Sequence, residues 1–303
     1  MGKEIERELE ELLGREKILY NEPMKRHTTF RVGGNAQYFL MPGSAEEIQA
    51  VVSLLKRHQI PFLTVGNGSN LLVGDRGIEG AVLHLGRSFG RISAEKNEIC
   101  AQAGALLSAV ANRAAKEGLA GLEFAAGIPG SLGGAVTMNA GAYGGEMKHV
   151  IRSVEVLTQD GQVRTMDNKD MEFGYRHSIV PEQGLIVLSA VFRLDRDAEA
   201  DIRARMEELS RKRREKQPLE YASAGSTFKR PEGYYAGKLI MEAGLAGFSS
   251  GGACVSEKHC GFVINTGDAT ARDVVTVMEH VKQTVREKFS VELEPEVRLT
   301  GRF

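Results

Sequence analysis

In the N-terminal part of the chain, hydrophobic positions occur either at helical spacing or in short apolar runs. A stripe of four residues predicts an amphipathic helix that ends at Gly14 and packs on its own domain: Ile5, Leu9, Leu12 and Leu13. A second helix begins after Ser44, because Glu47 three residues later completes a capping-box signature. A third helix ends at Gly118, a typical C-terminal glycine. The apolar runs between them predict strands at 36–41, 60–65, 81–85 and 99–103.

The second half of the chain continues this alternation after an interruption. Residues 119–147 show little periodicity, and a loop of this length inside a compact domain is usually functional. Strands are expected at 151–157 and 163–166, joined by a turn at Asp160–Gly161, and again at 185–194. The remaining pattern predicts helices at 201–216, 236–243 and 270–289 and strands at 261–265 and 294–299. Mixed elements of this kind indicate an α+β protein.

Composition and charge exclude several classes of protein. The chain of 303 residues carries a formal net charge of -1, which argues against a protein that binds nucleic acid or a membrane surface. The basic run 211–216 follows two glutamates within a predicted helix, so we interpret it as a solvated face rather than a binding patch. No apolar stretch approaches the roughly 20 residues that span a bilayer, and the first residues lack a signal-peptide core. Three cysteines are expected to be reduced thiols in the cytoplasm.

Two glycine-rich segments are candidates for binding a phosphate-bearing cofactor. Glycine is over-represented, with 35 residues, and outside repeats such an excess indicates tight turns or close approach of the backbone to a ligand. In VGNGSN, residues 65–70, consecutive backbone N–H groups could bind a phosphate, although taken alone the pattern is more often an ordinary βα turn. In GIPGSLGGA, residues 127–135, small residues leave a flat surface suited to a dinucleotide. Neither segment has the Rossmann or Walker A pattern.

Individual polar residues are ambiguous when each is taken alone. Ser226 lies between small residues, where a side-chain turn is more common than catalysis. Arg176 fits a surface ion pair, and Glu296 fits a simple pairing with Arg298. The trio Cys254, His259 and Cys260 lacks a fourth ligand and matches no common zinc spacing, so we expect no metal site.

In combination, these segments resemble the UDP-N-acetylmuramate dehydrogenase family, also called UDP-N-acetylenolpyruvoylglucosamine reductases. The resemblance extends from about residue 28 to residue 301 and includes seven motifs in the family's order. They are TTFRVGG (28–34), VGNGSNLLV (65–73), GLEFAAGIPGSLGGAVTMNAGAYGG (121–145), YRHS (175–178), AGSTFKRP (224–231), GGACVSEKHCGFVIN (251–265) and PEVR (295–298). Each motif is modest evidence, and together they are specific.

The resemblance implies a fold and a reaction. The fold would be a vanillyl-alcohol-oxidase-like FAD-binding fold of two subdomains, at 1–75 and 76–200, with a C-terminal α+β substrate-binding domain at 201–293. The C-terminal strand, 294–303, is a candidate to return to the first subdomain. Members use NADPH to reduce non-covalent FAD and then reduce the enolpyruvyl group of UDP-N-acetylglucosamine enolpyruvate in peptidoglycan precursor synthesis. The length matches the shorter subtype.

The resemblance also implies roles for residues of this chain. Arg176, Ser226 and Glu296 occupy the family's catalytic positions, with Ser226 as proton donor. Tyr175, Lys229 and Arg230 are expected to contact the UDP-sugar substrate. The expected FAD contacts are Gly66, Asn67, Gly68, Ser69, Asn70, Leu71, Gly127, Ile128, Pro129, Gly130, Ser131, Gly133, Gly134, Asn139 and Gly141.

Two departures and two alternatives limit this interpretation. Family members often have Ser at the position of Gly174 and Asn at that of Arg230, so local substrate contacts differ here. The first alternative is another oxidase or dehydrogenase of the same flavin-domain class, acting on a small alcohol. The second is a non-catalytic nucleotide-binding module. The sequence specifies no oligomeric state.

Overall fold

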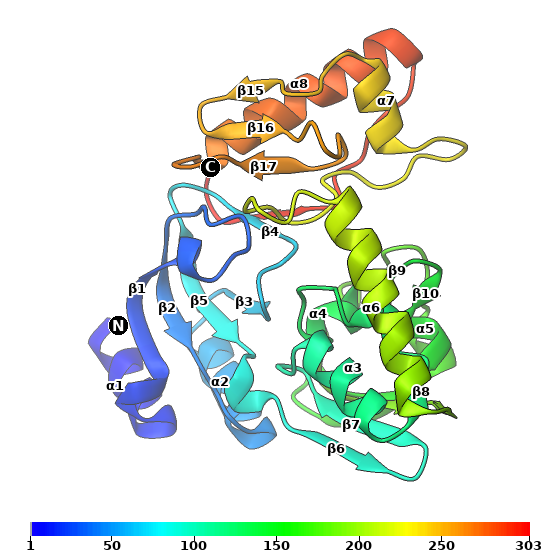
Figure 1. Cartoon of the computed structure of the whole chain (residues 1–303). Coiled ribbons are helices and arrows are strands. Elements are labelled where there is room, and N and C mark those ends of the chain that lie inside the picture. The colour runs from blue at the N-terminus through cyan, green and yellow to red at the C-terminus, as the bar shows by residue number, and fades with distance from the viewer. Residues whose placement is uncertain (1) are drawn as a thin grey trace. The chain divides into compact units, whose positions relative to one another are not determined.

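The computed structural model describes residues 2–303, and these divide into two compact units (Figure 1). Unit 1 comprises residues 2–20, 38–67 and 80–213, and unit 2 comprises residues 21–37, 68–79 and 214–303. Each unit is therefore assembled from separate stretches of the chain. The linear division into three domains that the resemblance implies stays a prediction.

The first sheet has the strand order β1–β2–β5–β3. Its strands are β1 (Ile18–Pro23), β2 (Asn35–Leu40), β3 (Phe62–Val65) and β5 (Ile78–His84). Two helices lie beside these strands, α1 (Gly2–Leu13) and α2 (Ala45–Arg57), and they pack on each other (Figure 1). The strands expected at 36–41, 60–65 and 81–85 are confirmed with shifted ends.

Two details of these helices differ from the sequence expectation. In α1, Ile5, Leu9 and Leu13 are buried, but Leu12 is 37% exposed, so its place in the buried stripe was wrong. It lies one position from Leu13, which rotates it off the packed face. At α2, the Ser44 hydroxyl accepts a hydrogen bond from the Glu47 N–H at 3.2 Å, as predicted.

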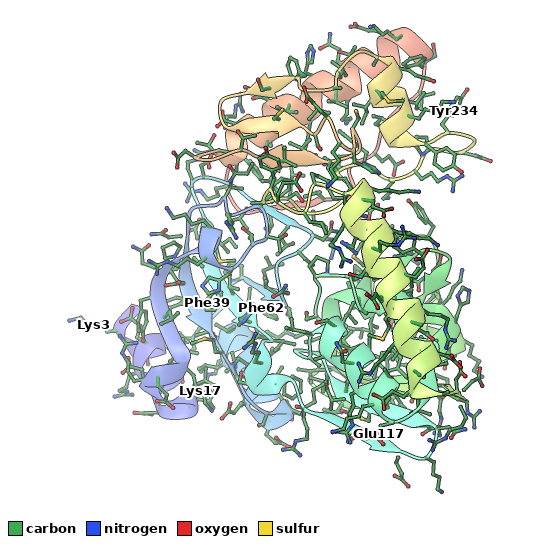
Figure 2. All side chains as sticks on the ribbon, in the orientation of Figure 1. Lys3, Lys17, Phe39, Phe62, Glu117 and Tyr234 are labelled. Carbon is green, nitrogen blue, oxygen red and sulfur yellow. The ribbon has the colours of Figure 1, made fainter. Side chains whose placement is uncertain are left out.

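The second half of that capping box goes elsewhere. The Glu47 carboxylate accepts a hydrogen bond from the Gly43 N–H at 2.7 Å. It also pairs with Lys17, labelled in Figure 2, at 2.5 Å. At the N-terminus of α2, the Glu47 side chain therefore bonds to the N–H of Gly43 and not to that of the N-cap residue, Ser44.

The second sheet is antiparallel, has the order β12–β11–β13–β7–β6, and belongs to unit 1. Its strands are β6 (Ile92–Glu95), β7 (Glu98–Gln102), β11 (Ile151–Leu157), β12 (Val163–Asp167) and β13 (Ile186–Arg193). The predicted hairpin of 151–157 and 163–166 is confirmed, with Gly161 at φ 81° in its turn. Helix α3 (Leu107–Lys116) is also confirmed and is followed by Gly118 at φ 65°. The strand β6 was not predicted.

Residues 119–147 are not the long irregular loop that the sequence suggested. They contain β8 (Leu119–Ala120), η4 (Glu123–Ala125), α4 (Leu132–Thr137), the hairpin β9 (Gly141–Ala142) and β10 (Gly145–Glu146), and the start of α5 (Met147–Val150). Strand β8 pairs with β14 (Asp195–Arg196). Glycine and alanine give no hydrophobic periodicity, so these elements depend on tertiary bonds. One example is the Leu132 N–H, which donates to Ala105 O at 2.8 Å.

Helix α6 (Glu199–Lys216) leads into unit 2, whose three-stranded sheet lies alongside α8 (Ala271–Phe289), shown in orange (Figure 1). The strands are β15 (Ser249–Ser250), β16 (Ala253–Val255) and β17 (Val263–Asn265), and α7 (Ala236–Glu242) also packs on α8. Thr270 and Asp273 form a complete capping box at the start of α8. The helices predicted at 201–216, 236–243 and 270–289 are confirmed.

The C-terminal strand was predicted at 294–299, but β18 covers only Arg298–Thr300. It pairs in parallel with β4 (Leu71–Val73), which had not been predicted as a strand. Residues 294–297 are instead hydrogen-bonded to Thr227 and Lys229 outside any regular strand, which explains the late start. The remaining short helices are η1 (Arg15–Lys17), η2 (Met24–Arg26), η3 (Arg87–Phe89) and η5 (Asn168–Met171).

Candidate functional site

In unit 1, the two glycine segments meet at Gly66 and Ser131. A Cβ atom added to Gly66 would lie 1.9 Å from Ser131 Oγ and 3.1 Å from its Cβ, so only glycine fits there without a shift. Next to Gly66, the Asn67 side chain donates a hydrogen bond to the carbonyl oxygen of Pro129. The loop after β3 is therefore held against residues 129–131, which the sequence had nominated separately as cofactor contacts.

These two segments leave hydrogen-bond donors unused. In unit 1, the backbone N–H groups of Asn67, Gly127, Gly130 and Ser131 donate to no backbone carbonyl of residues 2–303. The hydroxyl of Ser131 is buried and has no hydrogen-bond partner among the described residues. Buried polar groups without partners are costly in a protein interior. The arrangement therefore suits an anionic ligand that would accept these hydrogen bonds, as the diphosphate of FAD would.

The rest of the first glycine loop belongs to unit 2. Gly68 has φ 61°, and a Cβ there would lie 1.9 Å from the carbonyl oxygen of His27, so this position also requires glycine. The Thr29 N–H donates to Gly68 O at 3.3 Å, and the Thr29 hydroxyl is buried without a partner. Thr29 was not among the predicted contacts. Its place in the TTFRVGG motif was the available signal.

In unit 2, the backbone of Thr227 brings Glu296 close to Ser226. The Glu296 N–H donates to the carbonyl of Thr227 at 2.8 Å, and the Lys229 N–H donates to the carbonyl of Glu294 at 2.8 Å. Thr227 is fully buried, and its hydroxyl accepts a hydrogen bond from the Val263 N–H at 2.9 Å. The sequence placed Glu296 inside a strand, whereas it precedes β18 in this irregular ladder.

Asn70 extends this unit 2 cluster to the cofactor loop. Its side-chain amide donates to the carbonyl of Glu296 at 3.0 Å, and its own carbonyl accepts from the Arg298 N–H at 2.9 Å. Gly66 and Asn67, at the start of this loop, belong to unit 1. Asn70 belongs to unit 2, as do Ser226, Lys229 and Glu296. Unit 2 therefore joins a predicted cofactor contact to two predicted catalytic residues.

Lys229 and Arg230, expected to contact substrate, have different surroundings. The Lys229 ammonium pairs with the exposed Glu294 carboxylate at 3.0 Å. The Arg230 guanidinium lies over the Tyr235 ring, 4.0 Å from its centroid, and Tyr235 is 60% exposed. The neighbouring Tyr234 projects from the same loop before α7 (Figure 2). Both cations are accessible, as a phosphate-binding role requires, and that role stays a prediction.

Arg176 and Tyr175 belong to unit 1, where they follow Gly174. Arg176 has φ 54°, its guanidinium lies 5.2 Å from the Tyr175 ring centroid, and its Nη2 is 3.5 Å from the carbonyl oxygen of Gly141. Gly174 pairs with His177 across an isolated bridge. The catalytic arginine of the prediction is thus presented on a tight turn beside the β9–β10 hairpin.

Asn139 holds that turn in place. This buried side chain donates to Gly174 O at 2.8 Å and to the Glu146 carboxylate at 3.0 Å, and it accepts from the Lys148 N–H at 2.9 Å. The Lys148 ammonium and the Asn139 amide hold the pKa of Glu146 below its usual range. These side-chain bonds use both amide hydrogens of Asn139, so its side chain positions the turn. Its role as a cofactor contact stays a prediction.

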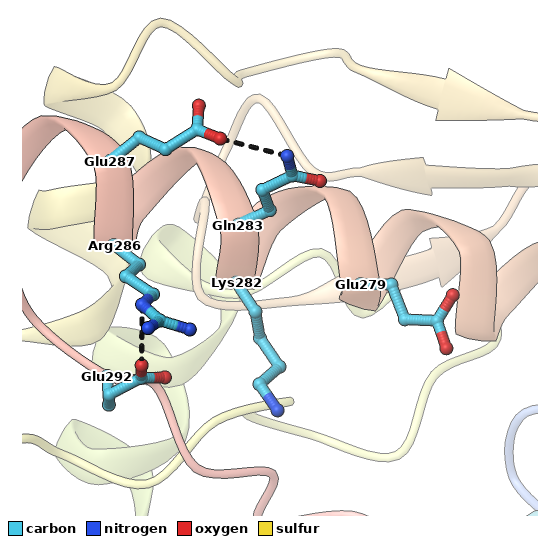
Figure 3. A pocket seen from close by; sticks show the side chains of 6 residues that line it. All are labelled: Glu279, Lys282, Gln283, Arg286, Glu287 and Glu292. Carbon is cyan, nitrogen blue, oxygen red and sulfur yellow. Dashed lines mark hydrogen bonds and ion pairs between the residues drawn. The ribbon is translucent and has the colours of Figure 1, made fainter.

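Other candidate sites in the described residues have different characters. A hollow on the outer face of α8 is bordered by charged and amide side chains that bond to one another, Gln283 to Glu287 and Arg286 to Glu292 (Figure 3). It contains none of the predicted site residues. Among residues 2–303, no group of three or more His, Cys, Asp or Glu side chains is placed to hold a metal ion. No helix in the same part of the chain is long and apolar enough to cross a membrane.

Comparisons with known proteins match both halves of this description. Residues 36–167 match an FAD binding domain, and residues 217–300 match the UDP-N-acetylenolpyruvoylglucosamine reductase C-terminal domain. The chain is 54% identical over 298 residues to the UDP-N-acetylenolpyruvoylglucosamine reductase of Agathobacter rectalis, covering 94% of this chain and 95% of the relative. It is 52% identical to the Caldanaerobacter subterraneus protein of the same name, with 97% of each chain covered.

Solved structures give the same result for the fold. The crystal structure of UDP-N-acetylenolpyruvylglucosamine reductase from Thermus caldophilus is similar with a TM-score of 0.79 and 36% identity, covering 93% of this chain and 97% of that one. An alkyldihydroxyacetonephosphate synthase aligns over 64% of this chain with a TM-score of 0.50 at 17% identity, which is a likeness of fold alone. The α+β FAD-binding fold with a C-terminal domain, expected from the sequence, is confirmed.

Proposed function

This chain belongs to the UDP-N-acetylenolpyruvoylglucosamine reductase family, and from that membership we propose that it uses NADPH to reduce the enolpyruvyl group of UDP-N-acetylglucosamine enolpyruvate. The product would be UDP-N-acetylmuramate, a precursor of peptidoglycan. The observation that carries the proposal is identity of about half the residues over nearly the full length of the curated relatives. The chain is an FAD-dependent oxidoreductase by the same comparison.

The residues present fit FAD. In unit 1, Gly66, Asn67 and the 127–134 segment would hold it, and the contacts expected at residues 68–71 stay predictions. Supporting this, glycine is required at Gly66 and Gly68 for steric reasons, and the Ser131 hydroxyl lacks a protein partner. When bound, FAD supplies the transfer of hydride from the nicotinamide to the methylene carbon of the substrate. We propose non-covalent attachment, as the resemblance implies.

Arg176 is assigned to the charge that this transfer creates. Addition of hydride to the methylene carbon leaves negative charge on the adjacent carbon, which spreads into the substrate carboxylate as an enediolate. A guanidinium offers a planar fork of donors that matches two carboxylate oxygens. Arg176 would bind these oxygens and stabilise the charge, because an electrostatic contact of this kind strengthens as the charge develops.

Ser226 is assigned to the proton. Its hydroxyl would protonate the carbon next to the carboxylate, which completes the reduction of the double bond. A hydroxyl is a weak acid, but it suffices against a basic carbanion when it is held within hydrogen-bond distance. Glu296, fixed beside Ser226 through Thr227, would hydrogen-bond the carboxylate in its protonated form. Lys229 and Arg230 would contact the substrate diphosphate.

The site of action is proposed to be the cytoplasm. Cys100, Cys254 and Cys260 are all free, which is typical of a reducing compartment.

One set of measurements tests the proposal. The purified chain should be yellow, and NADPH oxidation should require UDP-N-acetylglucosamine enolpyruvate. After denaturation and filtration, the flavin should pass into the filtrate. Flavin that stays attached to the chain, with oxidation of small alcohols, would indicate the other class of flavoenzyme. A chain that consumes no NADPH with any of these substrates would be a binding module, and the proposal would be wrong.

A further inference from the structure

The basic run at the end of α6 contains one arginine whose surroundings differ from those of its neighbours. Arg211 and Lys212 both pair with Glu208, at 2.7 and 3.2 Å, and the Arg211 side chain is 53% exposed. These two residues form the solvated face that the sequence predicted. Arg213 does not. A Cβ atom placed on Gly127 would lie 3.2 Å from Arg213 Cδ and 3.5 Å from its Nη1.

Arg213 therefore lies directly on the second glycine segment, and both residues belong to unit 1. A Cβ atom at position 127 would therefore lie slightly closer to the arginine stem than ordinary van der Waals contact allows. Gly127 is one of the residues that the resemblance assigned to cofactor binding. No pattern in the sequence distinguished Arg213 from the four other basic residues of the run.

The charge of Arg213 is not neutralised within the protein. Burial lowers the pKa of its guanidinium, and the nearby Tyr143 hydroxyl acts in the opposite direction. Its side chain forms no hydrogen bond or ion pair with any residue in 2–303. The acid closest in sequence to Gly127, Glu123, pairs instead with Arg205 at 2.7 Å. Arg213 is partly buried, and a partly desolvated cation without an anion is unfavourable, so proteins usually pair such a charge.

Hydrogen-bond donors are available in the glycine segment that Arg213 contacts at Gly127. The N–H groups of Gly127, Gly130 and Ser131 donate to no backbone carbonyl of the described chain, and the buried Ser131 hydroxyl has no partner there. A guanidinium beside such donors can bind two oxygens of a phosphate through parallel hydrogen bonds. The missing component of this arrangement is an anion with several oxygens.

We propose that Arg213 binds a diphosphate oxygen of a nucleotide that lies on the Gly127–Gly134 segment. The inference rests on the proposed function, which supplies three ligands of this chemistry: FAD, NADPH and the UDP-sugar. All three carry a diphosphate, and the experiment separates them. Arg213 is thus a binding residue that neither the motifs nor the resemblance assigned.

The test compares R213M and R213K with R211M in the holoenzyme. Methionine keeps the apolar stem that lies on Gly127 and removes the charge, whereas lysine keeps the charge and removes the fork. Arg211 is the matched control, because it stands on the same helical turn and pairs with Glu208. Release of FAD on dilution is followed by flavin fluorescence. Affinity for NADPH comes from the rate of flavin bleaching without UDP-sugar, and affinity for the UDP-sugar from the shift in flavin absorbance.

R213M should weaken one of the three affinities by about 10- to 100-fold, with R213K intermediate and R211M unchanged. The affected ligand identifies the diphosphate. Two results would overturn the inference: all three affinities of R213M within twofold of wild type, or all three reduced in parallel with a lower unfolding temperature. A chain that binds FAD but does not reduce the UDP-sugar would contradict the proposed function, and FAD release would still report on Arg213.

Discussion

The two clusters of predicted catalytic residues are built in different ways. Around Arg176 in unit 1, four residues other than glycine adopt positive φ: Asn139 at 43°, Tyr143 at 51°, Glu172 at 48° and Arg176 itself at 54°. Around Ser226 and Glu296 in unit 2, a ladder of backbone hydrogen bonds joins residues 227–229 to residues 294–296. A left-handed backbone is unfavourable for most residues and persists only where the surroundings enforce it.

The difference determines what a substitution does in each unit. In unit 1, the turn that presents Arg176 depends on side-chain bonds of Asn139, so a change there alters the backbone as well as the chemistry. In unit 2, the ladder uses backbone groups, which remain when a side chain is replaced. We therefore expect chemistry and folding to be separable around Ser226 and inseparable around Asn139.

The largest expected effect is on turnover in S226A. Removal of the proton donor should lower turnover with the UDP-sugar by about 100- to 10,000-fold, while NADPH still bleaches the flavin at close to the normal rate. The unfolding temperature should stay near that of wild type, because the ladder does not use the Ser226 hydroxyl. Steady-state and single-turnover absorbance measurements would check both steps.

S223A is the control for that variant, since Ser223 lies in the same segment and the mechanism gives it no role. It should have normal turnover. Normal turnover of S226A with the UDP-sugar would rule out Ser226 as the donor. Loss of flavin bleaching in S226A would mean that the unit 2 cluster is not separable from cofactor binding.

The second effect, in N139A, should combine lost stability with lost activity. The substitution leaves the Gly174 carbonyl and the Lys148 N–H without their partner, which is expected to cost about 1–3 kcal/mol for each buried group left unpaired. Asn139 also has positive φ, where alanine is strained. Thermal unfolding and the kcat for the UDP-sugar should fall together.

N139G and N112A separate the two causes. Glycine tolerates the positive φ, so N139G should recover the backbone part of the loss and none of the hydrogen-bond part. Asn112 is exposed and bonds only within its own helix, so N112A should behave as wild type. If N139A lost activity at full stability, the turn around Arg176 would be as separable as the unit 2 ladder.

The third effect concerns packing between the glycine segments. G66A places a methyl group 1.9 Å from Ser131 Oγ and should destabilise unit 1 by about 1–3 kcal/mol, with faster release of FAD. The double variant G66A/S131A removes that oxygen and should recover part of the stability, because the nearest remaining Ser131 atom is 3.1 Å away. G174A is the control, since its Cβ would meet His177 at an ordinary 3.5 Å. Additive effects of G66A and S131A would show that the contact is relaxed by other atoms.

The sequence predicted the elements with strong periodicity and missed those without it. Helix α8 was found because its apolar residues repeat at helical spacing and Thr270 caps it. Helix α4 was missed because LGGAVT has almost no apolar stripe, and it is held by bonds to residues that lie about 28 positions earlier, such as Leu132 N–H to Ala105 O. The ends of β18 were misplaced because its pairing with β4 joins residues that are far apart in the chain.

The site shows the same division between local pattern and tertiary contact. Gly66 and Gly68 could be nominated from a motif because steric exclusion of a side chain is a local requirement. The role of Arg213 could not, because five basic residues in one run look alike until the fold places one of them on Gly127. Asn139 was nominated as a cofactor contact, whereas the structure shows its side chain bonded to a turn 35 residues later.

The smallest effect is a pH dependence of stability from His259 in unit 2. Burial lowers the pKa of this imidazole. Its Nδ1 accepts a hydrogen bond from the Gly261 N–H at 3.2 Å, and a nitrogen can accept this bond only when it carries no proton. The unfolded chain therefore binds a proton more readily than the folded chain. The contribution of His259 to the free energy of unfolding is fully present above a pH of about 6.5. It is lost as the pH falls through the lowered pKa.

Urea unfolding of wild type and H259Q between pH 5 and 7.5 would measure this contribution. Glutamine does not titrate, so the free energy of unfolding should fall less steeply with acidification in H259Q than in wild type. H149Q, at an exposed histidine, should follow the wild-type curve. Because the side chain of His259 bonds to Gly261 and its N–H to Ser256, which have no role in the proposed mechanism, the turnover of H259Q at pH 7.5 should be normal. A parallel fall of wild type and H259Q would show that His259 binds a proton equally well in the folded chain, and that the Gly261 bond does not hold the ring neutral.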